Sequence, residues 1–514
     1  MGTETWRSAA IVTLLSGAVA GAPGDGAAQD GAARGPSGRS PASISWPDDA
    51  AVPAAPRPLR MPRLPGPVEV DGRLDEAAWE RIPPLPLTML WPSFQGEMTE
   101  ETEIRIAYDD EALYASGRFL DGDPGGVRAN SFYRDRWAGD DAFDLIVDAF
   151  NDDRTALKFT TTPLGILLDD EIRNDAEPGP GIEYLNPEWN AFWSAESRIT
   201  EEGWFTEIRI PFSTLRFQPD DRGRVVMGII AARYISRKSE KHIFPAIPPR
   251  WEAPDFKPSQ ARDVILEDVS SDRLVEVAPY ALAGLRGLVD APPSAEPEGA
   301  GPREVGLDLK YGLTSNLTLD LTANTDFAQV EADDQQVNLT RFNLFFPEKR
   351  DFFQERASVF EFNASDEVRL FHSRRIGLGP DGEPVRILGG ARLAGRAGLW
   401  DVGLLDIQLD GADGRPGENT GVARARRGLG DGVSYVGGML TSRIPTEGGA
   451  RLDYGADGLF ALGDRELLTV QLARSWREEG EGASSIGDAS LARLFLERRS
   501  ASGLGYYLDL ARAG

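Results

Sequence analysis

The sequence predicts an all-β protein in which an antiparallel β-sandwich is followed by an antiparallel transmembrane β-barrel. Apolar and polar residues alternate in short runs up to about residue 272, which is typical of strands with one buried face. After residue 272 the alternation becomes longer and cleaner, which is typical of strands that cross a membrane. Helical periodicity is nearly absent, apart from a short turn over residues 74–79.

Composition excludes several classes of protein. The chain has 514 residues, no cysteine and only two histidines, His242 and His372. Disulfide scaffolds, Cys-based zinc or iron–sulfur sites and Cys nucleophiles are therefore excluded, and sites built from several histidines nearly so. The 82 acidic and 55 basic residues give a net charge of −27, so the chain repels nucleic acid. The length alone predicts two or more domains.

The first 63 residues are expected to lie outside the folded parts. Residues 1–28 are typical of a secretory signal peptide, because Arg7 precedes an apolar run that ends in small residues. A short disordered tail is the alternative interpretation of this run, which is too short to span a membrane as a helix. Residues 29–63 are rich in Ala, Gly, Pro and Ser, which predicts a disordered leader.

The first folded region, residues 64–272, is predicted to form the β-sandwich. Alternation runs through residues 103–108 and through residues 204–210, and further strand-like stretches cover residues 143–150, 157–162 and 225–232. Each stretch is bounded by Asp, Gly or Pro. Trp79, Trp189, Trp193 and Trp204 are expected to lie in the core or to pack against strands.

Four motifs in this region resemble the family 9 carbohydrate-binding modules. They are Val68-x-Val70-Asp71-Gly72-x-Leu74-Asp75-Glu76-x-x-Trp79, Ile106-x-Tyr108-Asp109-Asp110-x-x-Leu113-Tyr114, Asp140-Asp141-x-x-Asp144-x-x-x-Asp148 and Gly203-Trp204-x-x-Glu207-x-x-Ile210-Pro211. In the first motif a strand ends in an Asp-Gly turn, Asp75 caps a helical turn and Trp79 returns to the sheet. The resemblance implies a sandwich fold and a carbohydrate ligand.

The resemblance also implies a sugar site. In such modules a sugar ring lies between two tryptophan faces, because one face of a pyranose is apolar while its rim is polar. By position, Trp137 and Trp251 match the two tryptophans, and Asp144 matches the acidic sugar ligand. Thr160 stands where the family has a basic ligand. The alternative is that Trp137 and Trp251 are ordinary aromatic residues at the rim of the sandwich.

A run of aspartates follows Trp137. Asp140, Asp141 and Asp148 are candidate ligands for Ca²⁺, a cation that prefers six to eight oxygen ligands. Two carboxylates of the run are also candidates for glycoside hydrolysis, which needs a pair flanking a cleft. The commonest alternative is that the run is a solvated rim of an acidic protein. No sequence feature marks out one carboxylic acid as a catalyst, so an enzyme is the second hypothesis.

The second region, residues 273–514, is predicted to form the barrel. Residues 305–313, 317–323, 452–462 and 504–510 alternate cleanly between apolar and polar side chains over membrane-spanning lengths. A soluble antiparallel sheet with one wet face gives the same alternation. The last strand pattern, residues 504–510, is followed by only four residues, so we expect an incomplete or unclosed barrel with an exposed edge strand.

Residues 326–362 interrupt the strand pattern. They combine phenylalanine pairs with the charged run Glu348-Lys349-Arg350, which suits a segment folded into a polar lumen or its mouth. Together with Leu370-Phe371-His372-Ser373-Arg374-Arg375-Ile376-Gly377, this constellation resembles the bacterial outer-membrane family with a DUF5916 barrel behind a carbohydrate-binding-like module. Asp351, Gln354 and Arg356 stand where that family usually shows Pro, Leu and Gly.

These observations predict an outer-membrane protein without catalytic activity, whose sandwich recognises a glycan or another polar solute beside the barrel. A glycoside hydrolase and an assembly or structural protein are the alternatives. The expected partners are a carbohydrate and membrane lipid. Short turns of such barrels face the periplasm, and residues 314–316 form a short turn, so the sandwich is expected in the periplasm and residues 326–362 at the outer mouth. The ligand and the oligomeric state do not follow from the sequence.

Overall fold

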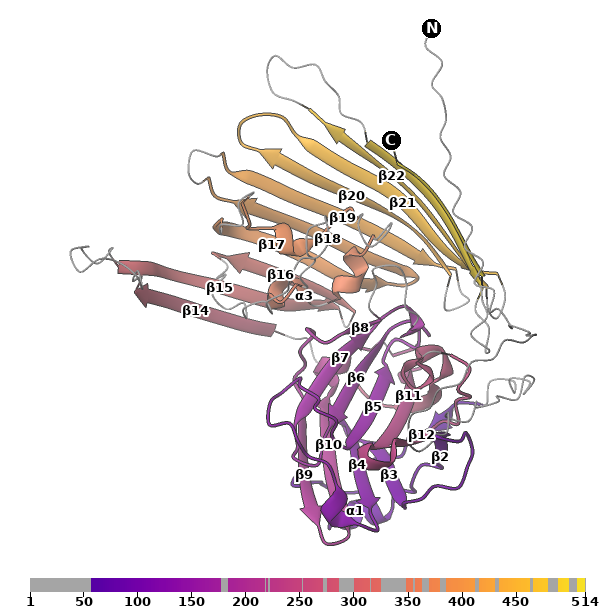
Figure 1. Ribbon diagram of the computed structural model, residues 1–514. Helices are drawn as coiled ribbons and strands as arrows, with labels where there is room; N and C mark the ends of the chain where they lie inside the picture. Colours follow the sequence, from indigo (N-terminus) through magenta and orange to yellow (C-terminus); the bar gives the residue numbers. More distant parts are fainter. Residues whose placement is uncertain are drawn as a thin grey trace, which may run out of the picture.

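The computed structural model describes residues 57–513, except for residues 177–183, 218, 221, 252, 271–274, 286–299, 315, 325–347, 355, 363–368, 380–384, 412–415, 430–433, 463–465, 479–488 and 499–505. The described residues form three β-sheets and a few short helices (Figure 1). The prediction of an all-β protein with mostly antiparallel strands is therefore confirmed. The predicted signal peptide and most of the predicted leader lie outside the described residues.

Two of the sheets form the β-sandwich. The larger has the order β1-β13-β11-β5-β6-β7-β8, with β12 paired to β11 and β2 paired to β12, and the smaller has the order β3-β4-β10-β9. The bounds are β1 Leu59–Arg60, β2 Thr88–Trp91, β3 Thr102–Tyr108, β4 Ala112–Leu120, β5 Ala142–Asp148, β6 Ala156–Thr161, β7 Leu167–Ile172, β8 Leu185–Asn186, β9 Ser194–Thr200, β10 Gly203–Pro211, β11 Arg224–Ile235, β12 Glu240–Phe244 and β13 Arg262–Glu267. Only β1 and β13 pair in parallel among these strands.

The main core lies between the two sheets. Trp204 from β10 and Phe119 from β4 are fully buried, and their rings lie 4.4 Å apart. Phe143 of the larger sheet meets Phe119 edge-on at 5.4 Å. Aromatic contacts of this kind stabilise a core by about 0.5–1.5 kcal/mol beyond the area they bury. The alternating side chains of β3, β5 and β10 thus point into one apolar layer, as the sequence predicts.

A buried carboxylate joins two of the sequence motifs. Glu207, on β10, is fully buried and accepts hydrogen bonds from the backbone N–H groups of Asp71 at 3.0 Å and Gly72 at 2.9 Å. Its other oxygen accepts a bond from Trp79 Nε1 at 2.8 Å. Trp79 lies in α1 (Ala77–Glu80). Glu207 therefore fixes both the Asp-Gly turn and the short helix against the smaller sheet.

The third sheet follows the sandwich in the chain. Its strands pair antiparallel in sequence order, from β14 to β24. They are β14 Val275–Leu285, β15 Ala300–Thr314, β16 Leu317–Ala323, β17 Ile387–Ala397, β18 Trp400–Leu409, β19 Glu418–Gly428, β20 Tyr435–Pro445, β21 Arg451–Ala461, β22 Glu466–Arg477, β23 Ala489–Arg498 and β24 Tyr506–Ala513. Among the described residues no pairing joins β14 to β24, so the sheet is open and no closed barrel is seen.

The two faces of the third sheet differ in chemistry. One face, which we call the bare face, carries large apolar side chains that are 37–71% exposed: Val275, Val277, Val305, Leu307, Leu321, Leu404, Val436, Leu440, Ile444, Tyr454, Leu472 and Leu494. The other face, which we call the charged face, buries ion pairs. Arg392 pairs with Asp320 on the adjacent strand at 2.9 Å, and Arg424 makes two bonds of 2.6 Å to Asp457.

A short segment packs on the charged face. It contains α3 (Asp351–Gln354) and the 3₁₀ helix η6 (Ala357–Phe360), and we call residues 348–362 the inner segment. The guanidinium of Arg392 lies 5.2 Å from the ring of Phe360. Gly403 makes room for this ring, because a Cβ at that position would lie 2.8 Å from it. The sequence pattern predicts that residues 326–362 fold into a polar lumen or lie at its mouth; residues 326–347 lie outside the described residues.

The inner segment also reaches the sandwich. Glu361 accepts a bond from Arg173 at 2.6 Å, and Gln354 accepts one from Asn186 at 3.4 Å. This part of the segment therefore lies at the sandwich end of the third sheet. The predicted position of residues 326–362 at the outer mouth stays a prediction. None of the described helices is long and apolar enough to cross a membrane.

Candidate functional site

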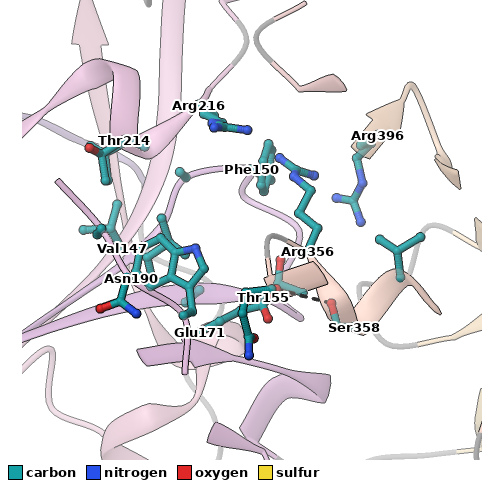
Figure 2. Close-up of a pocket in the computed structure, with 18 of the residues that line it drawn as sticks. Val147, Phe150, Thr155, Glu171, Asn190, Thr214, Arg216, Arg356, Ser358 and Arg396 are labelled. Carbon is teal, nitrogen blue, oxygen red and sulfur yellow. Dashed lines mark hydrogen bonds between the residues drawn. The ribbon is translucent and has the colours of Figure 1, made fainter. Parts of the chain in front are cut away.

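A cavity of about 200 Å³ lies at the junction of the sandwich, the inner segment and the third sheet (Figure 2). We call it the junction pocket. Its lining combines aromatic, amide, hydroxyl and charged side chains: Phe150, Asp152, Thr155, Glu171, Trp189, Asn190, Phe192, Thr214, Arg216, Glu276, Lys310, Gln354, Arg356, Ser358, Arg396, Asp401 and Arg426. A mixture of apolar walls and a few converging polar groups is the usual character of a small-molecule site.

The sandwich supplies the aromatic and amide wall. Trp189 and Asn190 belong to the connection between β8 and β9, which Asp169 of β7 holds in place. The buried Asp169 carboxylate accepts bonds from Ala191 N at 2.5 Å and from Trp193 Nε1 at 3.2 Å, and it also pairs with Arg134. Burial raises the pKa of Asp169 to about 6, against the opposing charge of Arg134.

The third sheet and the inner segment supply the basic wall. Arg396, near the end of β17, bridges the two parts of the molecule, at 2.7 Å from Asp152 in the sandwich and 2.8 Å from Asp401 in β18. Arg426 lies 3.5 Å from the same Asp401. The guanidinium of Arg356 lies 4.3 Å from the ring of Phe150. The pocket thus exists only where the sandwich and the sheet meet.

The pocket carboxylates are engaged by cations. Asp152 and Asp401 share Arg396, as described above, and Glu171 lies 3.0 Å from Arg173. Glu171 also accepts a bond from Ser358 of the inner segment at 3.3 Å. A glycosidase needs one carboxylic acid that stays protonated and a second carboxylate beside the substrate. These salt-bridged carboxylates give no support to that chemistry.

Asp144, the predicted sugar ligand, lies in a separate and closed cluster. Its carboxylate is only 5% exposed, lies 3.1 Å from Lys241 and accepts a bond from Thr160 at 2.7 Å. The ring of Phe256 covers Lys241 at 5.1 Å. Burial alone would raise the pKa of Asp144, but the charges of Lys241 and Lys158 outweigh it, so the pKa is lowered. The residue is therefore held as an internal anion, and its role as a sugar ligand stays a prediction.

The two predicted tryptophans lie in different surroundings. Trp137 is half-exposed; its Nε1 donates to the carbonyl of Asp140 at 3.1 Å, and its ring meets Tyr234 edge-on. Trp251 is partly buried, with Lys257 5.6 Å from its ring. No contact joins either tryptophan to Asp144 among the described residues. The predicted sugar site at these three residues is thus not assembled by direct contacts, and it too stays a prediction.

The candidate calcium ligands bind backbone groups instead. Asp140 accepts bonds from the N–H groups of Ser131 at 3.0 Å and Ala138 at 2.8 Å, and Asp148 accepts one from Asp153 at 2.9 Å. Burial raises the pKa of Asp148, and the neighbouring Asp152 raises it further. Within the part of the chain that the structure describes, no group of three or more acidic or histidine side chains is placed to hold a metal ion.

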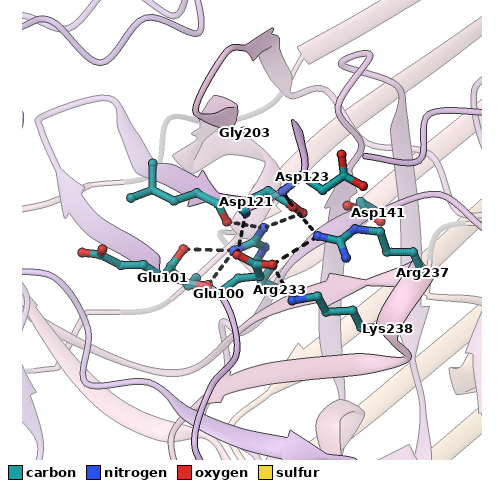
Figure 3. A network of polar contacts seen from close by, with 12 residues as sticks. Glu100, Glu101, Asp121, Asp123, Asp141, Gly203, Arg233, Arg237 and Lys238 are labelled. Carbon is teal, nitrogen blue, oxygen red and sulfur yellow. Dashed lines mark hydrogen bonds and ion pairs between the residues drawn. The ribbon is translucent and has the colours of Figure 1, made fainter. Parts of the chain in front are cut away.

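Asp141 lies beside a second polar network, built around the fully buried Arg233 (Figure 3). Arg233 donates to the carbonyls of Glu101 at 3.0 Å and Leu120 at 2.9 Å. Asp141 itself accepts a bond from the backbone of Ser236 at 2.9 Å. These bonds tie the ends of β3 and β4 to β11, so the network has a structural role.

Sequence reasoning does not find the junction pocket. Its residues come from segments between residues 147 and 426, and they share no motif spacing. The one feature of the sequence that points to this pocket is Arg356, which stands where the resembling family usually shows Gly. The structure explains why glycine suits that position, since Arg356 has a φ of 49° in the left-handed region.

Comparisons with known proteins support the predicted domain of the second region. Residues 279–390 match the family model described as a domain of unknown function, DUF5916. No curated protein matches the chain.

Two solved structures are similar to part of the chain. One is a family 9 carbohydrate-binding module from Caldicellulosiruptor kristjanssonii in complex with cellotriose, with 14% identity and a TM-score of 0.26, covering 42% of this chain and 96% of that one. The other is a candidate carbohydrate-binding protein from Bacteroides uniformis, with 15% identity and a TM-score of 0.32, covering 41% of this chain and 98% of that one. Over residues 279–390, the predicted DUF5916 domain is confirmed.

Proposed function

We propose that this chain is an outer-membrane protein that recognises a glycan or another polar solute beside its membrane part. The bare face of the third sheet carries the membrane part of this proposal. Leu404, Leu440 and Leu472 are each about half exposed there, on neighbouring or nearby strands. Exposed apolar patches of this extent mark contact with a partner or a membrane. Lipid is the partner that suits a sheet with exposed large apolar side chains on most strands from β14 to β23.

The geometry of the strands supports lipid contact. A membrane-spanning strand needs about 9–11 residues, and β17, β18, β19, β20 and β21 have 10 or 11. The charged face buries Arg392 and Arg424, which suits the polar inside of a barrel. In this proposal the open sheet forms part of a barrel wall, with the inner segment on the lumen side.

The connections between strands support a periplasmic sandwich. At the sandwich end β15 connects to β16 between Thr314 and Leu317, and β17 to β18 between Ala397 and Trp400. At the other end β14 connects to β15 between Leu285 and Ala300, and β16 to β17 between Ala323 and Ile387. Barrels have short turns on the periplasmic side and long loops outside. The sandwich therefore belongs on the periplasmic side in this proposal.

The junction pocket carries the recognition part of the proposal. Trp189 offers a flat apolar surface, and Asn190 and Thr214 offer an amide and a hydroxyl in the same cavity. Sugars combine an apolar ring face with a polar rim, so this combination suits a sugar ring. A cavity of about 200 Å³ is smaller than the roughly 300–1,000 Å³ of drug-sized sites, which favours one small unit.

Localisation is tested with the full chain in a Gram-negative host. We expect it in the outer-membrane fraction, and we expect protease added to intact cells to spare the sandwich. Recovery in the soluble fraction would refute the membrane part, and release of the sandwich by external protease would refute the orientation.

Recognition is tested by a glycan array with the detergent-solubilised full chain. Asn190→Ala removes an amide of the junction pocket, and Trp137→Ala removes the aromatic residue of the alternative site. We expect Asn190→Ala to weaken binding and Trp137→Ala to leave it unchanged. The reverse result would favour the site implied by the resemblance. Absence of any glycan binding by the native chain would refute this part of the proposal.

A further inference from the structure

Most charges in the junction pocket cancel within the protein. Arg396 lies 2.7 Å from Asp152 and 2.8 Å from Asp401, Arg426 lies 3.5 Å from Asp401, and Arg173 lies 3.0 Å from Glu171. Glu276 lies 4.0 Å from Lys310. The carboxylates of the pocket are therefore already paired, and a cationic ligand would find no unpaired acidic side chain among them.

Arg356 is the exception among the pocket cations. No ion pair or hydrogen bond joins its guanidinium to another described residue, and its contact is with the face of Phe150 at 4.3 Å. Stacking on an aromatic ring leaves the N–H groups at the guanidinium edge free for an acceptor. The side chain is partly buried, so the N–H groups that face the pocket have limited access to water.

Two further observations concern Arg356 and its surroundings. Its backbone lies in the left-handed region, with φ 49° and ψ 38°, where glycine fits without strain and other residues are rare. Arg216 also lines the pocket, and its pKa is lowered to about 10, first by burial and then by the charge of Arg356. Figure 2 shows Arg216, Arg356 and Arg396 gathered around Phe150. An anion among these groups would relieve the repulsion between them.

We infer that the junction pocket binds the carboxylate of an acidic sugar, with Arg356 as the side chain that pairs with it. One guanidinium that no described ion pair engages matches one negative charge, and an Arg–carboxylate pair can form two parallel hydrogen bonds. A doubly charged phosphate would carry one negative charge more than this guanidinium can match. The inference rests on the proposed function, since it names the chemical class of the solute recognised at the same pocket.

The sandwich side of the pocket indicates which chemical groups the rest of the ligand carries. Trp189 and Asn190 lie on the sandwich side of the cavity, across from the inner segment that carries Arg356. A hexuronate would direct its carboxylate to Arg356 and its ring to the tryptophan. Its hydroxyls would then meet the side chains of Asn190 and Thr214.

Calorimetry with the detergent-solubilised full chain tests the inference, using glucuronate, glucose and acetate as probes. We expect glucuronate to bind at least 10-fold more tightly than glucose or acetate. Arg356→Gly fits the left-handed backbone and removes only the side chain; we expect it to weaken glucuronate about 10- to 100-fold, the range for a hydrogen bond to a charged group, and to leave glucose unchanged. Arg222→Gly, in an exposed turn of the sandwich, is the matched control and should change nothing.

The outcomes separate this inference from the proposed function. Equal binding of glucuronate and glucose, or glucuronate binding that survives Arg356→Gly, would overturn the inference and leave solute recognition standing. Acetate binding as tight as glucuronate would show a simple anion site and overturn the sugar assignment. Failure of both sugars, together with a blank glycan array, would refute the proposed function and the inference together.

Discussion

The Glu207 carboxylate offers the sharpest test of how the sandwich is held together. It is fully buried and accepts three hydrogen bonds, from Asp71 N at 3.0 Å, Gly72 N at 2.9 Å and Trp79 Nε1 at 2.8 Å. Glu207→Gln keeps the shape of the side chain but replaces one acceptor oxygen by an N–H₂ group. At least one of the three donors must then face another donor and lose its bond.

The magnitude follows from the number of bonds lost. One buried donor left without a partner costs about 1–3 kcal/mol, so Glu207→Gln should lower the free energy of local opening by that amount. This corresponds to about 5- to 150-fold faster hydrogen exchange, since each 1.4 kcal/mol is tenfold. Glu207→Ala leaves all three donors unpaired and should cost roughly 3–6 kcal/mol, taking about 1–2 kcal/mol for each.

Hydrogen–deuterium exchange of the full chain measures this at the amides of Asp71 and Gly72. Trp79→Phe removes the indole N–H with part of the ring and leaves both oxygens of Glu207 in place, so these two amides should stay protected in that variant. Glu196→Gln is the matched control, because Glu196 lies opposite Glu207 on β9 but is exposed. Unchanged exchange at the two amides in Glu207→Ala, which removes both acceptor oxygens, would refute the role of this carboxylate.

Three further predictions concern the third sheet and the buried charges. Leu404→Arg, on the bare face, should cost about 2–4 kcal/mol if lipid covers it, and lower the membrane yield; Leu399→Arg, in a turn, should not. Gly403→Leu should displace the inner segment and increase protease cleavage there, whereas Gly438→Ala, with its nearest contact at 3.5 Å, should not. Burial acts to raise the pKa of Asp144, but the charges of the neighbouring lysines outweigh burial and lower it. The ion pair of Asp144 therefore stabilises the fold above about pH 4, and this stabilisation is lost as the pH falls further. Asp144→Asn should therefore lower the unfolding free energy by about 1–3 kcal/mol at pH 7, with a smaller difference at pH 3, and a constant difference would contradict this assignment.

Much of the fold follows from the sequence because strand patterns are local. The alternation of apolar residues predicts β3 and β10 closely, since a period of two fixes which side chains face the core. Trp204 lies in that core, as predicted. The parallel pairing of β1 with β13 could not be predicted, because it joins residues about 205 positions apart through backbone bonds that carry no side-chain pattern.

The site is harder to predict because its interactions are not local. From the sequence, Asp144 is one of several aspartates in a strand, and that strand matches a motif of the resembling family. The sequence does not show that Lys241 and Asp255, about 100 positions later, turn this carboxylate into part of a closed charge cluster. Buried ion pairs between distant strands leave no periodic signal. The same holds for the junction pocket, where Asp152 and Arg396 meet across 244 positions.

The inner segment connects the pocket to the charged face of the sheet. Gln354, Ser358 and Glu361 bond to the sandwich, while Phe360 lies against Arg392 of the sheet. Arg356 lies between these anchors, so a ligand that pairs with it adds a further contact to the same short segment. A ligand that binds one arrangement of a segment better than others stabilises that arrangement by its difference in affinity. Recognition at the junction pocket would therefore fix the inner segment on the charged face, which in the proposed function is the lumen side of the membrane part.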